Sequence, residues 1–161
     1  MTVLRAILAP AEALLGSNAL AHVVICNPDG TPQVSVVWCA ARGDQILFCT
    51  EAASAKVRNL RRDPAVVLSI EDEERNQRGA QQHLLVYGWA EIVPGKASKE
   101  LCDELCRVYT GQADHELNLS RSPSALTVSV AVGAHRVGRR RPHRRQRPLD
   151  VGPPVGSLGR R

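Results

Sequence analysis

A basic helix that follows a strand carries the residues of this chain best suited to chemistry. The segment TEAASAKVRNLRRDP covers residues 50–64, where Ser54 is suited to begin a helix and Pro64 to end it. Because the first N–H groups of a helix lack partners and carry partial positive charge, this turn is suited to bind a phosphate. Thr50 and Ser54 add hydroxyl donors, and Lys56 adds a full charge on a flexible stem. Further positive charge on the same helix comes from Arg58, Arg61 and Arg62.

The residues alone leave two interpretations of this segment open. In the first, main-chain amides, the Thr50 and Ser54 hydroxyls and the Lys56 ammonium hold an anionic phosphate. In the second, the segment is a solvated basic helix with a capping serine. Its composition is compatible with both.

Apolar and alternating runs around this helix predict strands. They cover residues 19–26, 33–41, 45–50, 65–71, 83–93 and 125–132 and are separated by turn formers such as NPDG at 27–30. The polar residues 72–82 predict a loop, and helices are predicted over residues 11–16, 54–62 and 96–109. Six strands with short flanking helices predict a mainly β fold, a closed or nearly closed antiparallel barrel. With 3% aromatic residues, Val, Leu, Ile and Ala must build most of its core.

The excess positive charge lies at the end of the chain. Residues 136–161 hold nine Arg and one acid, Asp150, so this end carries +8 and the rest of the chain −3. The basic balance therefore does not indicate that the folded part binds nucleic acid. Residues 138–161, rich in Arg, Pro and Gly, predict a disordered tail after a single domain over residues 1–137. Three interpretations of the tail stay open: a solvated tail, a tether for nucleic acid or an acidic partner, or an out-of-frame translation of GC-rich DNA.

The sequence lacks the motifs of several enzyme classes. It has no Gly-x-Ser-x-Gly elbow, no P-loop, no Gly-x-Gly-x-x-Gly run and no His-rich cluster, so no metal site is expected. No run approaches the roughly 20 apolar residues that cross a bilayer. The first nine residues lack the features of a signal peptide, which predicts a cytoplasmic protein without a membrane contact. Five cysteines predict buried free thiols in a reducing compartment: Cys26, Cys39, Cys49, Cys102 and Cys106.

Three segments in order resemble one known family. DGTPQVSVVW (29–38), TEAASAKVRNLRRDP (50–64) and YGWAEIV (87–93) are similar to the pyridoxamine 5′-phosphate oxidase-like split-barrel family. The resemblance is closest to the branch of actinobacterial proteins that use the deazaflavin coenzyme F-420, and it covers roughly residues 14–137. It implies a six-stranded, FMN-binding-like split β-barrel and a homodimer with the cofactor cleft at the subunit interface.

The resemblance also implies which residues hold the cofactor. The family's S-x-K-x-x-N-L segment, in which Lys and neighbouring polar groups hold the phosphate, matches Ser54, Lys56, Asn59 and Leu60. The strand that matches residues 35–38 runs alongside the ring system, mostly through backbone groups. The expected cofactor-binding residues are Ser35, Val36, Val37, Trp38, Thr50, Ser54, Lys56, Asn59 and Arg61, and no catalytic residue is assigned.

Structural roles stay open for some of these residues. Val36, Val37 and Trp38 also fit the core of a strand, and Asn59 also fits a solvent-facing helix position. Gly88 is interpreted as a β-bulge rather than a ligand contact.

The chain departs from the family pattern in two places. His22 stands where members usually have Thr, and it is interpreted as structural unless it faces the cleft, where it would donate a hydrogen bond to substrate. The last strand leads into the Arg-rich tail instead of a short ordered end that often contains Trp.

The implied function is an oxidoreductase that uses F-420 to transfer a hydride to a small unsaturated or quinone-like acceptor. Hydride chemistry belongs to such a cofactor, and the protein supplies orientation, a dry pocket and electrostatics. The alternatives are an FMN-dependent oxidase or reductase of the pyridoxamine phosphate oxidase type, and a non-enzymatic cofactor-binding protein. A nucleic-acid-binding function rests on the tail alone.

Overall fold

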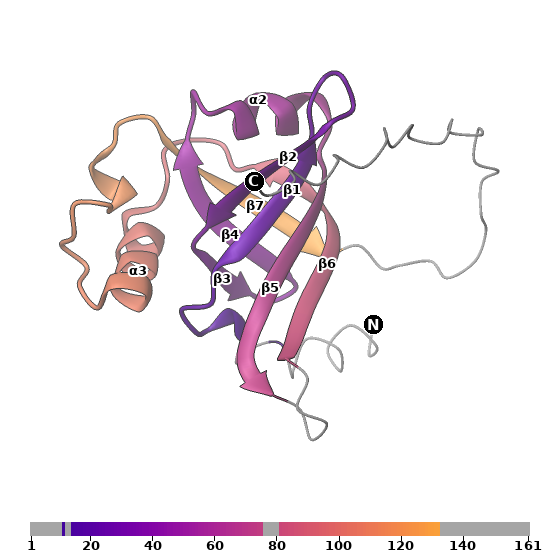
Figure 1. Ribbon diagram of the computed structural model, residues 1–161. Helices are drawn as coiled ribbons and strands as arrows, with labels where there is room; N and C mark the ends of the chain where they lie inside the picture. Colours follow the sequence, from indigo (N-terminus) through magenta and orange to yellow (C-terminus); the bar gives the residue numbers. More distant parts are fainter. Residues whose placement is uncertain (1–10, 12–13, 76–80, 133–161) are drawn as a thin grey trace, which may run out of the picture.

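The computed structural model describes residue 11, residues 14–75 and residues 81–132, which form one antiparallel sheet with helices at its margins (Figure 1). Its strands are β1 (Ala21–Cys26), β2 (Pro32–Val37), β3 (Cys39–Arg42), β4 (Gln45–Glu51), β5 (Ala65–Arg75), β6 (Gln81–Ile92) and β7 (Ala125–Val132). The helices are α2 (Ala55–Arg62), α3 (Lys99–Thr110) and the short 3-10 helix η1 (Leu119–Arg121). Helical backbone also occurs at Ala11, Leu14 and Leu15, within the first predicted helix. The predicted mainly β fold is confirmed, and the predicted tail over residues 138–161 lies outside the described residues.

The sheet is open, and a single residue joins its two edges. The strand order is β2-β1-β5-β6-β7-β4-β3, so β2 and β3 are the edge strands although they are consecutive in the chain. Trp38 alone separates Val37, at the end of β2, from Cys39, at the start of β3. The sheet must therefore curl until its edges come together at Trp38. Figure 1 shows the curled sheet. The result is a split barrel.

The described sheet has seven strands where the sequence predicts six, and the difference lies at Trp38. The apolar run over residues 33–41, predicted as one strand, forms β2 and β3 with a break between them. The Trp38 ring stacks on the Tyr109 ring of α3, with centroids 5.3 Å apart. The Tyr109 hydroxyl accepts the Cys39 N–H at 3.1 Å. Contacts with a helix that is distant in sequence therefore stabilise the break. The apolar run alone does not predict these contacts.

Two further boundaries differ from the prediction. Strand β5 continues to Arg75 and β6 begins at Gln81, inside the polar stretch 72–82 that predicts a loop. The two strands pair there at Arg75 and Gln81, after a register shift between Glu71 and Arg75, so backbone pairing extends both strands beyond their apolar sequence. Helix α3 begins at Lys99 instead of residue 96 because Ser98 caps it, accepting the Leu101 N–H at 3.2 Å.

Gly88 is not a bulge, so that prediction is wrong. It pairs in regular register with Val66 and Val132. A Cβ atom at this position would lie 2.4 Å from the Ala131 carbonyl oxygen and 2.9 Å from Val130 Cγ1. Glycine stands here because β7 passes too close to leave room for a side chain.

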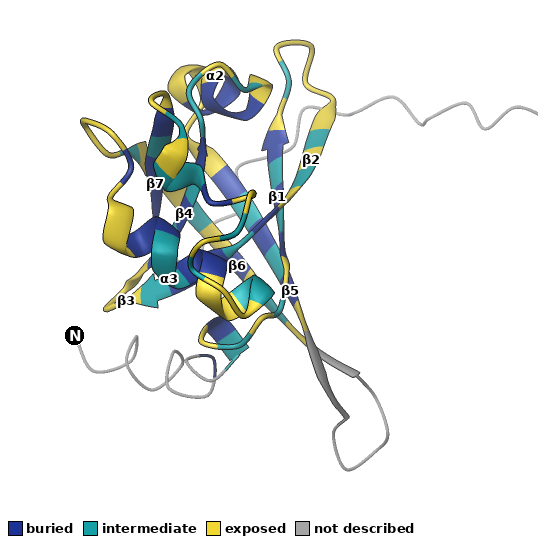
Figure 2. Ribbon diagram, turned by 90° about the vertical axis from the view of Figure 1, so that its left-hand side faces the viewer, coloured by how far each residue is buried: buried dark blue, intermediate teal, exposed yellow. Residues whose placement is uncertain are grey.

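Aliphatic side chains fill the interior of the curled sheet. On β1, β2, β4 and β5 they alternate with more exposed residues, so one face is buried and one faces outward (Figure 2). On β7 both faces are buried over residues 127–130. Phe48 is an aromatic member of this core, which otherwise relies on branched residues as the composition predicts. The largest fully buried side chains are Phe48, Ile46, Leu68, Ile70, Val23, Val57, Val128 and Val130.

The two longer helices flank the sheet at different places. Helix α2 covers one end and α3 lies against one side (Figure 1). Ser54 caps α2 and Asp63 ends it, which confirms the helix predicted over residues 54–62. Val57 and Leu60 turn toward the core and anchor α2 to the sheet. No helix within the described part of the chain has the length and apolar character needed to cross a membrane.

Candidate functional site

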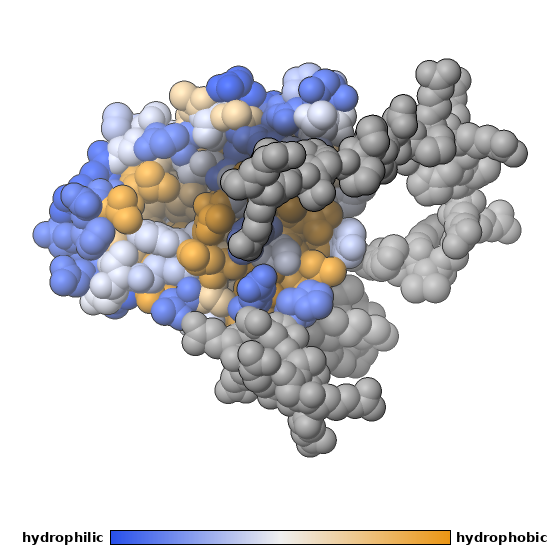
Figure 3. Space-filling view, in the orientation of Figure 1, coloured by the Kyte–Doolittle hydropathy of each residue, from blue (hydrophilic) through white to orange (hydrophobic). Residues whose placement is uncertain are grey.

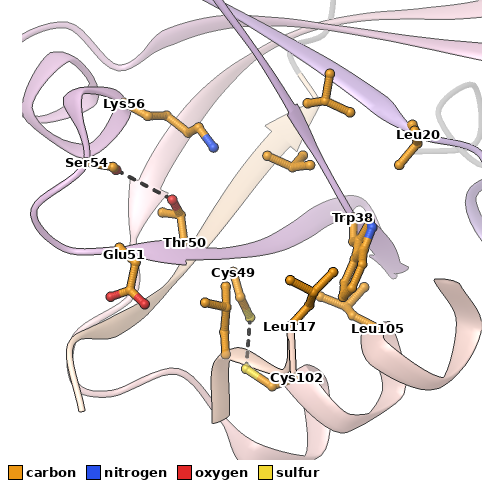
Figure 4. A pocket seen from close by; sticks show the side chains of 13 residues that line it. Leu20, Trp38, Cys49, Thr50, Glu51, Ser54, Lys56, Cys102, Leu105 and Leu117 are labelled. Atoms are coloured by element: carbon orange, nitrogen blue, oxygen red, sulfur yellow. Dashed lines mark hydrogen bonds between the residues drawn. The ribbon is translucent and has the colours of Figure 1, made fainter. Parts of the chain in front are cut away.

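A cavity of about 420 Å³ lies beside Trp38, the residue that joins the two edge strands. Its walls come from the end of β2, from β4, from the start of α2, and from α3 with the loop that follows it (Figure 4). Polar side chains gather at the α2 end, and apolar side chains gather around Trp38 at the other. The lining residues are Leu20, Val36, Val37, Trp38, Cys49, Thr50, Glu51, Ser54, Lys56, Cys102, Leu105, Leu117 and Leu119.

The polar end of the cavity is the N-terminus of α2. Ser54 Oγ accepts the Val57 N–H at 3.3 Å and lies 3.5 Å from Thr50 Oγ1. The N–H groups of Ala55 and Lys56 make no hydrogen bond with another described residue. Two main-chain donors and two hydroxyls therefore surround one corner of the cavity, where the helix dipole favours an anion.

Lys56 brings a positive charge into the same corner. Its residue is 8% exposed, and its Nζ lies 5.4 Å from the centroid of the Phe48 ring. No hydrogen bond or ion pair joins this ammonium to another described residue. Burial lowers the pKa of Lys56 from its ordinary value of 10.5, because the charged form loses hydration. A buried ammonium without a counter-ion favours an anionic ligand such as a phosphate.

Glu51 is the carboxylate among the lining residues, and it points away from Lys56 (Figure 4). Its Oε2 accepts hydrogen bonds from Ser122 Oγ at 3.0 Å and Ser124 Oγ at 2.6 Å. These hydroxyls hold the negative charge away from the corner, which stays electropositive. The part of the chain that the structure describes holds no cluster of three or more His, Cys, Asp or Glu placed to bind a metal ion.

Trp38 forms a flat wall at the apolar end. Its ring lies at 11° to the Tyr109 ring behind it. The Tyr109 hydroxyl donates to the Ala19 carbonyl at 2.8 Å, and burial raises the pKa of Tyr109, so the donor stays protonated. Leu105 and Leu117 lie beside Trp38 (Figure 4). Such a wall suits a planar, conjugated ring system.

The folded part of the chain matches one family model over most of its length. The model of pyridoxamine 5′-phosphate oxidase covers residues 9–137. The chain belongs to the pyridoxamine 5′-phosphate oxidase family. Comparison with curated proteins gives no significant match.

Solved structures with the same fold carry different names. An F420 reductase is 29% identical, with 76% of this chain and 93% of that chain covered and a TM-score of 0.64. A conserved hypothetical protein from Mycobacterium tuberculosis is 25% identical, with 77% and 79% covered and a TM-score of 0.61. The heme storage protein of Vibrio cholerae, at 13% identity, 78% and 90% coverage and a TM-score of 0.55, shares the fold alone. The cofactor of this family member must therefore be argued from its own residues.

Most of the cofactor-binding residues predicted from the family resemblance come together at the cavity. Those that line it are Val36, Val37, Trp38, Thr50, Ser54 and Lys56. Ser35, Asn59 and Arg61 do not line it. Ser35 Oγ is buried without a partner among the described residues, and Arg61 is exposed on α2.

Asn59 is buried, so the alternative of a solvent-facing position is wrong. Its Nδ2 donates to Asn27 Oδ1 at 2.9 Å and to Gln33 Oε1 at 2.7 Å. These bonds tie α2 to the β1–β2 hairpin. Asn59 thus fixes the angle at which the helix N-terminus meets the cavity.

Two of the basic residues on α2 are bound to main-chain carbonyls. Arg58 donates to the Ala53 carbonyl at 2.6 Å, and Arg62 donates to the Cys26 carbonyl. His22 is half-buried in β1, pairs with Val36 and Ser69 across the sheet, and does not line the cavity.

Sequence analysis missed the part of the cavity that comes from α3 and the segment after it. These residues are Cys102, Leu105, Leu117 and Leu119, together with Leu20, Cys49 and Glu51 on the other walls. The apolar spacing of α3 predicts a buried face, and Leu101 and Leu105 do pack against Ala40. Nothing in that spacing indicates which part of the sheet the face covers.

Proposed function

We propose that the cavity binds a phosphate-bearing flavin-type cofactor, with the deazaflavin coenzyme F-420 favoured, and that the protein is an oxidoreductase. The observation that carries the proposal is the buried, unpaired Lys56 ammonium beside the N-terminus of α2, opposite the flat wall of Trp38. One end of the cavity complements a phosphate and the other a conjugated ring. The F420 reductase at 29% identity supports the deazaflavin over FMN.

The residues of this chain have separate roles in the proposal. A bound flavin-type cofactor would supply hydride transfer to a small unsaturated or quinone-like acceptor. Ser54, Lys56 and the free amides of α2 hold the phosphate, and Trp38 orients the ring. Leu105 and Leu117 exclude water from the ring, which strengthens the electrostatic interactions inside the cavity.

Cofactor choice is tested by titrating the purified full-length protein with F-420 and with FMN in parallel, following the fluorescence of each. We expect saturable binding of both ligands at one site, with F-420 the tighter. Tighter binding of FMN would favour the FMN-dependent alternative, and binding of neither would overturn the proposal. Oxidation of reduced F-420 by a quinone acceptor then separates an oxidoreductase from a cofactor carrier, which binds without turnover.

We also propose that the protein is a homodimer, joined through the outer face of β2, β1, β5 and β6. Paired residues on this face form an apolar row in which Val24 lies between Val34 and Val67. In the next row Val36 and Leu85 flank the polar pair His22 and Ser69. Apolar side chains gather over these strands in Figure 3. The most exposed members of the face are Val34 (58%), Val36 (52%), Leu85 (46%), Tyr87 (56%) and Trp89 (60%). A contiguous apolar face of this kind is typical of an interaction surface.

The position of Val36 links this face to the cavity. Val36 belongs to the exposed face and also lines the cavity, at the edge strand β2. A partner seated on the face would therefore border the cavity and shield its open side.

We expect Trp89→Glu to convert the dimer to a monomer, because it places a charge within an apolar interface. The dissociation constant should rise at least about 30-fold, as for loss of a ~2 kcal/mol interface residue. Size-exclusion chromatography with light scattering, at several concentrations, measures the change. Val108→Glu is the matched control, since Val108 is an exposed apolar residue (40%) on α3, away from this face. A wild-type protein that stays monomeric at all concentrations would contradict the proposed interface.

A further inference from the structure

Two cysteines from distant parts of the chain meet in the cavity wall. Cys49 lies on β4 and Cys102 on α3, and their sulfur atoms are 3.4 Å apart (Figure 4). Both residues line the cavity. A disulfide has an S–S length of about 2.05 Å, so the sulfurs need to approach by roughly 1.4 Å. Both thiols are free in this structure.

The surroundings keep this pair neutral and leave it accessible from the cavity. Cys102 is 3% exposed and packs with Ala97 and Ala125, while Cys49 is half-buried. Burial raises the pKa of both thiols, and burial together with the neighbouring Cys102 sulfur raises that of Cys49 to about 12. The hydrogen bond with Cys49 acts in the opposite direction on the pKa of Cys102. Two protonated thiols make contact without charge repulsion, and a small molecule in the cavity reaches them.

The other three cysteines have different surroundings. Cys106 Sγ contacts Thr110 Oγ1 at 3.8 Å, and Cys39 Sγ contacts the Tyr109 hydroxyl at 3.9 Å. Cys26 is exposed at the end of β1. No other two cysteine sulfurs make a hydrogen-bond contact, and the structure describes all five cysteines. The geometry therefore selects one pair.

We propose that Cys49 and Cys102 form a dithiol modification site that closes to an intramolecular disulfide when a peroxide enters the cavity. A base from solvent takes the proton of the half-buried Cys49, a step that its raised pKa makes slow. The thiolate attacks the peroxide, the O–O bond breaks to give a sulfenic acid and hydroxide, and the hydroxide takes the proton back to form water. Cys102 then attacks the Cys49 sulfur, the S–S bond forms, and a second water leaves with the remaining thiol proton. Two thiols and one peroxide yield one disulfide and two waters, so the thiols lose the two electrons that reduce the peroxide.

The bond would join two elements of the cavity wall. Cys49 immediately precedes Thr50, at the polar end, and Cys102 lies one helical turn before Leu105, at the apolar end. Closing the S–S distance draws α3 toward β4 and fixes both ends of the wall. The inference concerns the chain without any ligand, so it stands or falls independently of the proposed cofactor.

The test treats the reduced full-length protein with hydrogen peroxide, alkylates the remaining thiols and maps the peptides by mass spectrometry without reduction. We expect one cross-linked peptide pair containing Cys49 and Cys102 and a protein mass lower by about 2 Da, both reversed by dithiothreitol. The melting temperature should rise by about 5–10 °C on oxidation, since the bond closes a long loop. Cys102→Ser should abolish the cross-link and the rise, and Cys106→Ser, as control, should keep both.

A second measurement does not depend on oxidation or on a folded variant. Phenylarsine oxide bridges two adjacent thiols with release of water, and the wild-type protein should bind one equivalent across Cys49 and Cys102 without peroxide. Peptide mapping that instead finds sulfinic acids on separate cysteines, or bonds that involve Cys26 or Cys106, would overturn the proposal. So would a protein that captures no arsenical at this pair.

Discussion

We expect the Lys56→Met variant to bind F-420 about 10- to 150-fold more weakly than the wild-type protein, equivalent to about 1.5–3 kcal/mol. Met keeps an unbranched side chain of similar length but removes the ammonium, which lies over the Phe48 ring beside the cavity. Fluorescence titration at constant salt concentration measures the change. Lys96→Met is the matched control, because Lys96 is exposed and does not line this cavity. Equal affinity of both variants would remove Lys56 from the site.

The same substitution should stabilise the protein in the absence of ligand. Burial lowers the pKa of Lys56 in the folded state below its unfolded value of 10.5, so folding works against the charged form. At a pH below both pKa values this penalty is fully present, and the Met variant escapes it. Between the two pKa values the unfolded chain binds more protons, so wild-type stability relative to the Met variant rises with pH. Thermal melts from pH 7 to 10 should show the difference narrowing.

A phosphate ligand reverses the sign of this effect. An anion beside the ammonium favours the charged form and raises the pKa of Lys56. Cofactor affinity should therefore be greatest below the pKa of the free protein and fall as the pH rises through it. The Met variant should lack this dependence, which separates the charge of Lys56 from its packing.

Local sequence signals were sufficient for the part of the site formed by one segment. The Ser54 cap, the stop at Asp63-Pro64 and the buried Val57 and Leu60 all follow from contacts within a few residues. The alternation of apolar with small or polar residues over 125–132 likewise predicts β7 with its observed bounds. The polar corner of the cavity could be predicted because strand, cap and lysine are adjacent in the chain.

The other parts of the fold and of the site depend on contacts between residues that are far apart in sequence. The break at Trp38 rests on Tyr109, and the position of Asn59 rests on Asn27 and Gln33. From the sequence, Asn59 is predicted to bind the cofactor because it lies on the helix that follows the phosphate-binding turn. In the structure its side-chain amide instead donates to Asn27 and Gln33. Where α3 docks, and hence which residues line the apolar wall, depends on the curl of the whole sheet.

Gly88 lies where β6 and β7 approach closely, and we expect Gly88→Ala to lower the free energy of unfolding by about 2–3 kcal/mol. The added Cβ would meet the Ala131 carbonyl oxygen at 2.4 Å, a backbone atom that cannot move without shifting β7. Strand β7 in turn pairs with β4, where Thr127 lies opposite Cys49 in the cavity wall. Urea unfolding measures the loss, and weaker cofactor binding should accompany it.

A substitution at Val130 shows whether the added Cβ at Gly88 clashes mainly with the backbone or with a side chain, since Val130 Cγ1 is the next nearest atom at 2.9 Å. If the carbonyl is decisive, Val130→Ala gives no relief, and the double variant is destabilised by about the sum of the two single losses. If Cγ1 were decisive, the double variant would recover stability relative to that sum. A Gly88→Ala protein as stable as the wild type would contradict the close approach of β6 and β7, and with it the reason for glycine at this position.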